Sequence, residues 1–289
     1  MQQLHRGLEG QYPVTRICNA LGLSRSSWYH RSKRKAKVIT QEEFRLHRRI
    51  KELFNSSRGS LGSRQLVKKL ASEGISVSRT KVRNIMKTHS LKVIQRTAYK
   101  VTTKRKHSDA VADNLLNMKF DPKLPNTVWA GDVTYLRTRE GWCYLAIVMD
   151  LHSRKIIGWS INKHMTAELV IKAMQMAINL RQPQGDLIFH SDRGSQYTGK
   201  RFRRLLNQHA IKASMSGKGA CWDNAVVERF FGSLKYEWLL KVIHLTRESM
   251  KIDVQKYIRY YNHDRLHTTL GDVTPVAYEK RNLKVSNFS

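Results

Sequence analysis

The chain has 289 residues, of which 40% are hydrophobic, so it can fold as one large or two modest domains and is not a disordered tail. Lys and Arg outnumber Asp and Glu by 53 to 22, which gives a formal net charge of +31. Such an excess repels itself unless an anionic partner is near, and nucleic acid is the usual partner of basic proteins. On charge alone, a ribosomal protein or a merely basic soluble protein stays open.

The positive charge is concentrated at the start of the chain. Residues 1–107 carry 26 Lys and Arg but only 5 Asp and Glu, a net charge of +21. We therefore expect the first third to contact DNA and the more acidic remainder to hold the catalytic domain.

The cysteines are sparse. Cys18, Cys143 and Cys221 lie far apart, so no pair has metal-ligand spacing and no disulfide framework is indicated. The first ten residues lack the apolar core of a signal peptide, and no apolar run approaches the ~18 residues of a membrane span. We therefore expect a reducing cytoplasm as the protein's location.

The first predicted unit is a helix-turn-helix-like segment at residues 1–37. Apolar residues recur at helical spacing until Gly22 interrupts them, and Ser24 can cap a second, basic helix whose core face includes Trp28. Helix, turn and basic helix are typical of DNA-binding motifs. An ordinary helical hairpin is an equal alternative.

Residues 38–95 are predicted to form a second helical DNA-binding domain. Three helices follow one another, with Ser63 expected to cap the second helix and Ser78 the third. The third helix is basic on its outward face, which is also typical of a solvated helix surface, but the regional charge favours DNA. The residues predicted to contact DNA from the two helical regions are Arg25, Arg79, Lys81 and Arg83.

A basic linker at 96–124 leads into a domain at 125–245 with an α/β pattern. We expect strands at 127–137, 142–152 and 155–161, a helix at 166–181, a strand at 186–192, a helix at 199–210, a strand at 211–216 and a long helix starting near Asp223. A C-terminal helical extension follows at 246–289, with a helix over roughly 247–264, then a loop near whose end Pro275 lies.

Three acids stand out by their places in this pattern. Asp132 lies inside the first strand, Asp192 follows the fourth strand, and Glu228 lies in an apolar stretch of the long helix. Three converging carboxylates would repel one another unless divalent cations neutralise them, and hard oxygen ligands suit Mg²⁺ or Mn²⁺. Two such ions ~3.5–4 Å apart can drive phosphoryl transfer. From the residues alone, an ion pair, a turn cap and a surface position are equally open explanations.

Three strings carry a specific resemblance: WAGDVTYL, HSDRGSQYT and SGKGACWDNAVVERFFGSLKYE. They resemble the catalytic core of the insertion-sequence-three family of bacterial transposases, in particular its second reading-frame product, OrfB, within the retroviral integrase superfamily. Asp192 and Glu228 are separated by 35 residues, which is similar to the family's D-35-E spacing. Lys235 lies seven residues after Glu228, where the family carries a basic residue. The string YNHDRLHTTLGDVTP resembles the family's C-terminal signature, so the resemblance covers nearly the whole chain.

The resemblance implies an RNase H-like mixed five-stranded sheet with a central first strand, on which Asp132, Asp192 and Glu228 converge as catalytic residues and metal ligands. It implies two Mg²⁺ (or Mn²⁺) ions and double-stranded DNA, both element ends and target, as substrate. The implied reaction is strand cleavage followed by attack of a 3′-hydroxyl on a phosphodiester, without a covalent protein intermediate. A homo-multimer on DNA and an OrfA or OrfA–OrfB fusion partner are also implied. No heptad run of the OrfA kind occurs here, so we expect the OrfB product alone.

Several supporting residues follow from helix and loop geometry. Asn224, Glu228 and Lys235 fall on roughly one helical face, so Asn224 and Lys235 are predicted DNA contacts, with Lys235 holding a phosphate. A surface lysine is the alternative. His190 and Ser191 are expected to support Asp192. Glycines that suggest a flexible loop open to DNA are Gly194, Gly217 and Gly219, and Trp222 is expected to pack on it rather than on a base.

Other polar residues are assigned structural roles. Asp150 ends the second strand and is expected to support the structure rather than to bind metal. His263 and His267 are four residues apart, but no second pair accompanies them, so hydrogen bonding or DNA contact is preferred to zinc. Two other functions compete with a transposase: a helix-turn-helix repressor with an inactive nuclease-like domain, and a nuclease for RNA–DNA hybrids.

Overall fold

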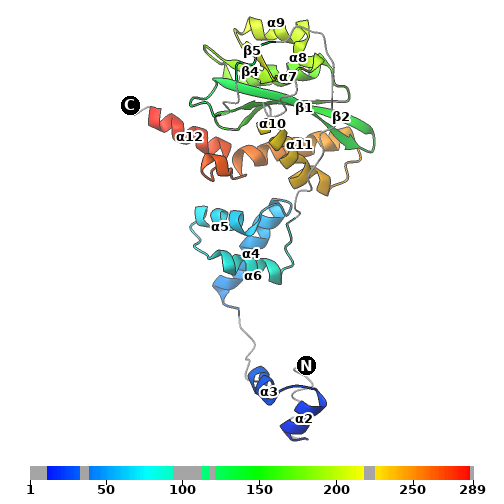
Figure 1. Cartoon of the computed structure of the whole chain (residues 1–289), viewed down its shortest axis with the longest axis vertical. Coiled ribbons are helices and arrows are strands. Elements are labelled where there is room, and N and C mark those ends of the chain that lie inside the picture. The colour runs from blue at the N-terminus through cyan, green and yellow to red at the C-terminus, as the bar shows by residue number, and fades with distance from the viewer. Residues whose placement is uncertain (1–11, 33–38, 94–111, 117–120, 218–224, 287–289) are drawn as a thin grey trace. The chain divides into compact units, whose positions relative to one another are not determined.

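The computed structural model describes residues 12–32, 39–93, 112–116, 121–217 and 225–286 (Figure 1). The chain divides into two units, residues 1–50 and 51–289. Within the described residues, every helix is too short or too polar to cross a lipid bilayer.

The first unit contains the two short helices predicted near the N-terminus. They are α2 (Val14–Ala20) and α3 (Arg25–Ser32), and they bury Ile17, Cys18 and Trp28 together. The hydroxyl of Ser24 accepts a hydrogen bond from the Ser27 backbone N–H at 3.1 Å, so the predicted cap is confirmed. Helix α4 (Gln41–Ser56) follows and crosses into the second unit.

Two further helices, α5 (Ser63–Ser72) and α6 (Arg79–Thr88), contact each other in the second unit. The prediction that Ser63 caps α5 was wrong, because Gly62 has the extended backbone of the cap and Ser63 begins the helix. Ser78 caps α6 as predicted, accepting from the Lys81 N–H at 3.2 Å. The apolar side of α6 is buried, and its basic side is exposed.

A five-stranded mixed sheet forms the centre of the second unit, in the order β3-β2-β1-β4-β5. Its strands are β1 (Val128–Thr138), β2 (Gly141–Asp150), β3 (Ile156–Asn162), β4 (Ile188–Ser191) and β5 (Lys212–Met215). Strand β1 is central, as the resemblance implied, and pairs antiparallel with β2 and parallel with β4. The pairing with β4 involves only residues 128–130, so the rest of β1 extends past it as a hairpin with β2.

Helices cover both faces of the sheet (Figure 1). One face packs on α7 (Ala167–Arg181), the short α8 (Ser195–Thr198) and α9 (Lys200–Gln208). The other packs on α10 (Ala225–Ser233) and α11 (Arg247–His263). The sheet and α7 approach very closely at Gly158, where an added Cβ would lie only 3.0 Å from the Ala177 backbone nitrogen. The two faces follow from alternation along β1, since successive side chains point to opposite sides.

The long helix predicted from near Asp223 does not continue as a regular α-helix. After α10, the chain forms a π-helical turn, η2 (Leu234–Trp238), and a 3-10 turn, η3 (Leu239–Lys241). The wider turn allows Leu234, Trp238 and Leu239 all to be buried in the same core cluster. Packing, rather than intrinsic helix propensity, explains the change.

A C-terminal helix, α12 (Pro275–Ser286), follows the 3-10 turn η4 (Thr268–Leu270), and the sequence analysis assigned no element there. Pro275 is its first residue, a position where the missing N–H and the fixed φ of proline suit a helix. The Thr274 hydroxyl accepts from the Ala277 N–H at 3.2 Å. The Thr274-Pro275 pair therefore marks the start of α12.

A buried carboxylate, Glu279, attaches α12 to the sheet. It accepts hydrogen bonds from the Ser153 hydroxyl at 2.7 Å, from Lys155 Nζ at 2.9 Å and from the Arg181 guanidinium. The side chains of Glu279 and Arg181 are only 9% and 14% exposed. Burial alone would raise the pKa of Glu279, but the hydrogen bonds from Arg181, Lys155 and Ser153 outweigh it and lower that pKa.

We predict that Glu279→Ala lowers the free energy of unfolding by roughly 3 kcal/mol, because it leaves the buried Arg181 guanidinium with only the more distant carboxylate of Asp150, 4.0 Å away. Glu248→Ala is the control: its exposed pair with Lys251 should contribute less than about 1 kcal/mol. Because the folded pKa of Glu279 is lowered, its contribution is present above the unfolded pKa of about 4.3 and is lost as pH falls through the folded pKa. Urea unfolding between pH 3 and 7 measures both variants. Equal losses, or a Glu279 effect that does not shrink in acid, would contradict this account.

Candidate active site

Asp132 lies on β1 opposite Ile147 of β2, just past the end of the pairing with β4. The alternation of β1 turns it toward the face that α10 covers. Its Oδ1 accepts a hydrogen bond from the Val133 N–H at 2.7 Å. Burial, followed by the nearby charges of Asp192 and Glu228, raises the pKa of Asp132 to about 8, against the lowering effects of the Val133 N–H and of Lys235. The ionised form of Asp132 is therefore energetically unfavourable.

Asp192 directly follows β4, the parallel neighbour of β1, so the two acids meet at one edge of the sheet. Its Oδ1 accepts from the Gly194 N–H at 3.0 Å. An added Cβ on Gly194 would lie 2.9 Å from that Oδ1 and 2.8 Å from the side-chain carbon Cδ of Gln196. Gly194 is thus required for close approach to the carboxylate, and its φ of −63° is not the special backbone that the flexible-loop interpretation assumed.

Glu228 lies in the first turn of α10. Its neighbours Val227 and Phe230 are buried in the core, so the helix is fixed while the carboxylate stays exposed. Partial burial of the carboxyl group still raises the pKa of Glu228, and its charge raises that of Asp132. Glu228 therefore lies near enough to Asp132 for its charge to act on that carboxyl group.

Lys235 is the cation that interacts with this group of acids. It belongs to η2, is half-buried, and has its Nζ 4.8 Å from the centre of the Tyr135 ring. Burial lowers the pKa of Lys235, and the charge of Asp132 opposes that effect. The structure thus brings Lys235 to the acids, although the register change at η2 removes the regular helical face on which the prediction relied.

The three carboxylates have the donor chemistry of a site for a hard divalent cation. Asp132 is destabilised by the charges of the other two acids, a repulsion that a bound cation relieves. The three carboxylates are not, however, in a metal-binding arrangement. No three His, Cys, Asp or Glu side chains converge tightly enough to hold an ion within the described residues 12–32, 39–93, 112–116, 121–217 and 225–286. The residues fit such an ion by chemistry and by electrostatics.

The residues next to Asp192 support it as expected. His190 is fully buried, with its Nδ1 2.9 Å from the Ser214 hydroxyl. The Ser191 hydroxyl donates to the Asp192 carbonyl oxygen at 3.0 Å. Both side chains thus tie the end of β4 to β5 and to the loop that carries the acid.

Asp150 and the C-terminal histidines lie apart from the acids. Asp150 is buried and accepts from the backbone N–H groups of Asn126 and His152 at 2.9 and 3.0 Å, which confirms a structural role. The ring of His267 packs on Tyr261, and burial lowers its pKa to about 3, whereas His263 is exposed. Cys18 and Cys143 are free and buried.

The residues predicted to contact DNA lie on different helices. Arg79, Lys81 and Arg83 are exposed on α6, and Arg25 is exposed at the start of α3. Predicted residues that lie outside the described part of the chain are Gly219, Cys221, Trp222 and Asn224.

The sequence analysis missed Tyr197, a fully buried residue of α8. It packs among Phe189 and Phe202. Burial, then the charges of Asp132 and Asp192, raise the pKa of Tyr197 well above its ordinary value, so it stays a neutral phenol beside the acids. Its signal was present in the string HSDRGSQYT, five residues after Asp192.

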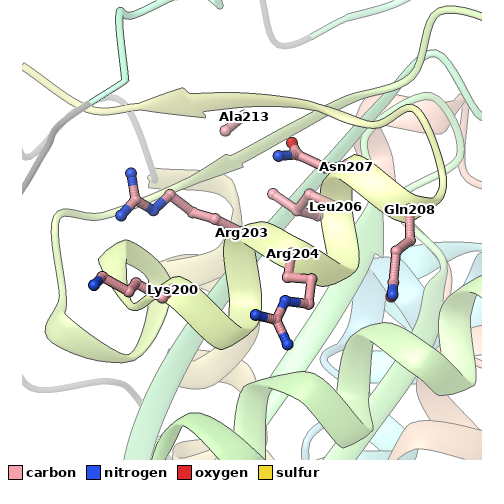
Figure 2. A pocket seen from close by; sticks show the side chains of 7 residues that line it. All are labelled: Lys200, Arg203, Arg204, Leu206, Asn207, Gln208 and Ala213. Carbon is pink, nitrogen blue, oxygen red and sulfur yellow. The ribbon is translucent and has the colours of Figure 1, made fainter.

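A basic groove beside α9 was also missed (Figure 2). It has a volume of about 760 Å³ and is lined by Lys200, Arg203, Arg204, Leu206, Asn207, Gln208 and Ala213. Figure 2 shows the side chains of Lys200 and Arg203 extending to the same side of the helix. Among the described residues, none of its three cations forms an ion pair with a carboxylate, so the groove offers its charge to an anion.

Comparison with known proteins assigns the chain. The integrase core domain family matches residues 122–221, a second integrase core domain family matches 209–275, and the HTH-like domain family matches 41–99. Over 278 residues the chain is 37% identical to Transposase InsF for insertion sequence IS3A of Escherichia coli K12, covering 95% of this chain and 96% of that protein. The chain belongs to the IS3 family of transposases.

A second curated relative also matches nearly the whole chain, and a solved structure matches about half of it. It is 38% identical over 266 residues to the insertion element IS600 uncharacterized 31 kDa protein of Shigella sonnei, covering 92% of this chain and 98% of that one. A solved structure of the HTLV-2 integrase catalytic core domain in complex with magnesium covers 53% of this chain and 94% of that one, at 24% identity and a TM-score of 0.42. The family resemblance, the integrase-core α/β fold and a role in DNA transposition, all expected from sequence motifs, are confirmed.

We predict that Asp132→Asn raises the melting temperature in metal-free buffer at pH 7 by several degrees, since each kcal/mol corresponds to roughly 2–4 °C for larger domains. A carboxyl group whose pKa is raised on folding disfavours the folded state above its unfolded pKa of about 3.9, and Asn removes that penalty. Mg²⁺ should stabilise the wild type more than the variant.

Calorimetry with EDTA or Mg²⁺ measures this effect. Asp186→Asn, at a carboxylate 87% exposed, is the control and should give no comparable rise. A lower melting temperature for Asp132→Asn in EDTA, or equal Mg²⁺ stabilisation of variant and wild type, would sink this account of the site.

Proposed function

We propose that Asp132, Asp192 and Glu228 are the catalytic residues with which this transposase cuts the ends of its element and joins them to target DNA. The observation that carries the proposal is the pKa of Asp132, which burial, Asp192 and Glu228 raise to about 8. A protein of net charge +31 has abundant cations to pair with acids, yet the negative charges of Asp192 and Glu228 act on Asp132. Repulsion of this kind is typical of functional sites.

The triad holds two divalent ions, Mg²⁺ or Mn²⁺, in this proposal. When bound, the pair would activate the attacking oxygen and stabilise the leaving oxygen of the phosphodiester. Asp132 supplies a ligand from the rigid centre of the sheet. The Gly194 N–H orients Asp192, and the buried flanks of α10 orient Glu228. A positioned substrate and fixed charges then suffice, without a covalent protein intermediate.

DNA contacts surround this triad in the proposal. Lys235 holds a phosphate near the reacting bond, since it is the cation that acts on Asp132. Asn224 contacts the same strand. The exposed cations of α6, together with Arg25, hold element-end DNA, and the groove beside α9 offers further charge to the backbone. Phosphate contacts of this kind position DNA, while base contacts specify it.

The proposed organisation follows the sequence: a helix-turn-helix-like segment at 1–37, a helical DNA-binding domain at 38–95, a linker at 96–124, the catalytic core at 125–245 and a C-terminal extension at 246–289. Two element ends must be joined in one reaction, so we expect a homo-multimer on DNA. OrfA, or an OrfA–OrfB fusion, is the proposed protein partner. In a bacterial cell the protein would act on the nucleoid.

We predict that Asp132→Asn, Asp192→Asn and Glu228→Gln each lower cleavage on the order of 10³-fold, because metal ligands are worth several kcal/mol of transition-state stabilisation. The assay is nicking of plasmids that carry the element's ends, with and without Mg²⁺. Glu248→Gln, at an exposed carboxylate of α11, should keep wild-type activity. Substantial Mg²⁺-dependent cleavage by any triad variant would remove that residue from the site. Cleavage by none of the proteins, wild type included, would favour a repressor, and cleavage only of RNA–DNA hybrids would favour the other nuclease.

We also predict that Lys235→Ala slows cleavage of specific ends about 10-fold or more at subsaturating DNA, the usual cost of one charge-assisted hydrogen bond. Metal affinity should change little, and Lys235→Arg should keep partial activity, because the charge remains while its shape changes. Lys251→Ala removes a lysine of α11 that is 49% exposed and is the matched control. End-cleavage kinetics decide: an alanine variant as fast as the control would make Lys235 an ordinary surface lysine.

A further inference from the structure

Two large aromatic side chains are exposed on the hairpin formed by β1 and β2. Tyr135 is 49% exposed and Trp142 is 43% exposed. Their rings meet edge to face, with centroids 5.3 Å apart at an angle of 81°. Rings of this size normally stabilise a fold by being buried, so a paired and exposed arrangement indicates a surface that binds something.

A cation lies over each of the two rings. The Arg137 guanidinium carbon is 4.8 Å from the centre of the Trp142 ring, and Lys235 Nζ is 4.8 Å from the centre of the Tyr135 ring. The order along the surface is therefore Lys235, Tyr135, Trp142, Arg137, which we call the aromatic strip. A pair of rings with a cation at each end matches a nucleotide in a DNA strand, in which the base is flanked by a phosphate on each side.

The aromatic strip begins at the catalytic acids. Tyr135 follows Asp132 by three residues on the same strand, ~10 Å at the usual rise of a β-strand, and its side chain points to the opposite face of the hairpin from the carboxylate. Lys235 belongs to both places, since its charge acts on Asp132 and its Nζ lies over Tyr135. The strip also lies past residue 130, where the pairing of β1 with β4 ends. A DNA strand leaving the triad can thus pass around this unpaired edge of β1, past Lys235, and onto the strip.

The backbone under the strip is fixed, which leaves the rings to act as a platform. Tyr135 lies opposite Tyr144, and Arg137 lies opposite Trp142, in the regular β1–β2 register. The Trp142 carbonyl oxygen accepts a hydrogen bond from Arg247 Nε at 3.1 Å. A rigid backbone favours stacking, because a flexible hairpin would lose conformational entropy when a base bound to its rings.

We propose that the aromatic strip binds an unpaired nucleotide of the DNA strand beside the reacting phosphodiester, with the base stacked on Tyr135 or Trp142 and its flanking phosphates on Lys235 and Arg137. In an intact duplex both faces of a base are covered, so only an unpaired base can occupy the platform. Stacking on aromatic rings is tolerant of base identity, so the strip recognises an opened end rather than a sequence. This inference rests on the proposed function, since it takes the triad as the cutting site.

The test uses the full-length protein and element-end oligonucleotides with 2-aminopurine at each of the last three positions, either fully paired or with that base unpaired. The variants are Tyr135→Leu and Trp142→Leu, which remove a ring, and Tyr135→Phe and Trp142→Phe, which keep one. Fluorescence and affinity are measured in EDTA, and cleavage is measured separately in Mg²⁺. Failure of cleavage in every protein would count against the proposed function alone, because the EDTA measurements do not depend on it.

The wild type should quench one 2-aminopurine position and should bind unpaired ends about 10-fold or more tightly than the leucine variants do, as base stacking on an aromatic ring predicts. The phenylalanine variants should keep most of both effects. In Mg²⁺, the leucine variants should lose more activity on paired ends than on ends already opened. Unchanged affinity and quenching in correctly folded leucine variants would overturn the inference. A changed oligomer mass in these variants with unchanged DNA affinity would also overturn it, because the rings would then belong to a protein–protein interface. Should the leucine variants unfold, Arg137→Gln decides: it should weaken binding to unpaired ends, and unchanged binding would also overturn the proposal.

Discussion

The repulsion among three carboxylates at one edge of the central sheet is the constraint on which this transposase depends. Asp132 is half-buried in the sheet, and Asp192 and Glu228 add negative charge near it, so its pKa rises to about 8. Charge that is disfavoured in the free protein becomes favourable once a divalent cation is bound. The same repulsion therefore destabilises the folded protein and favours the binding of a cation.

The fold holds these acids in place by rigid packing close to each of them. At Gly131, beside Asp132, an added Cβ would lie 2.6 Å from the Phe189 ring, so β1 and the neighbouring strand β4 pack closely there. Gly194 allows the backbone to hydrogen-bond the carboxylate of Asp192. Buried Val227 and Phe230 fix α10 under Glu228.

Much of this arrangement was predictable from the sequence. The strand around Asp132 alternates, β4 is short and apolar, and the helices have regular apolar faces, so local pattern indicated the elements and the places of the acids in them. The assignment of the triad came from the motif spacing. The capping role of Ser78 also followed from local rules.

Features that depend on contacts distant in sequence were not predictable. The π-turn η2 follows from burying Leu234 and Trp238 together, and the nearness of Tyr197 to the acids follows from how α8 packs on β4. Gly194 was interpreted as part of a flexible loop, because the sequence does not reveal what an added Cβ would touch. The pairing of Tyr135 with Trp142 requires the strand register, which only the folded sheet defines. The helix α12 is different, since its Thr-Pro start was visible but was not used.

The central claim is that these carboxylates bind the metal directly, and a change of ligand atom tests it best. Asp192→Cys replaces a hard oxygen ligand by sulfur, which Mg²⁺ binds poorly and Mn²⁺ accepts better. We predict that end cleavage by Asp192→Cys is lost in Mg²⁺ and partly restored in Mn²⁺, while Asp192→Ser stays inactive in both. A cysteine variant with wild-type activity in Mg²⁺, or one that gains no more from Mn²⁺ than the serine variant does, would contradict direct coordination.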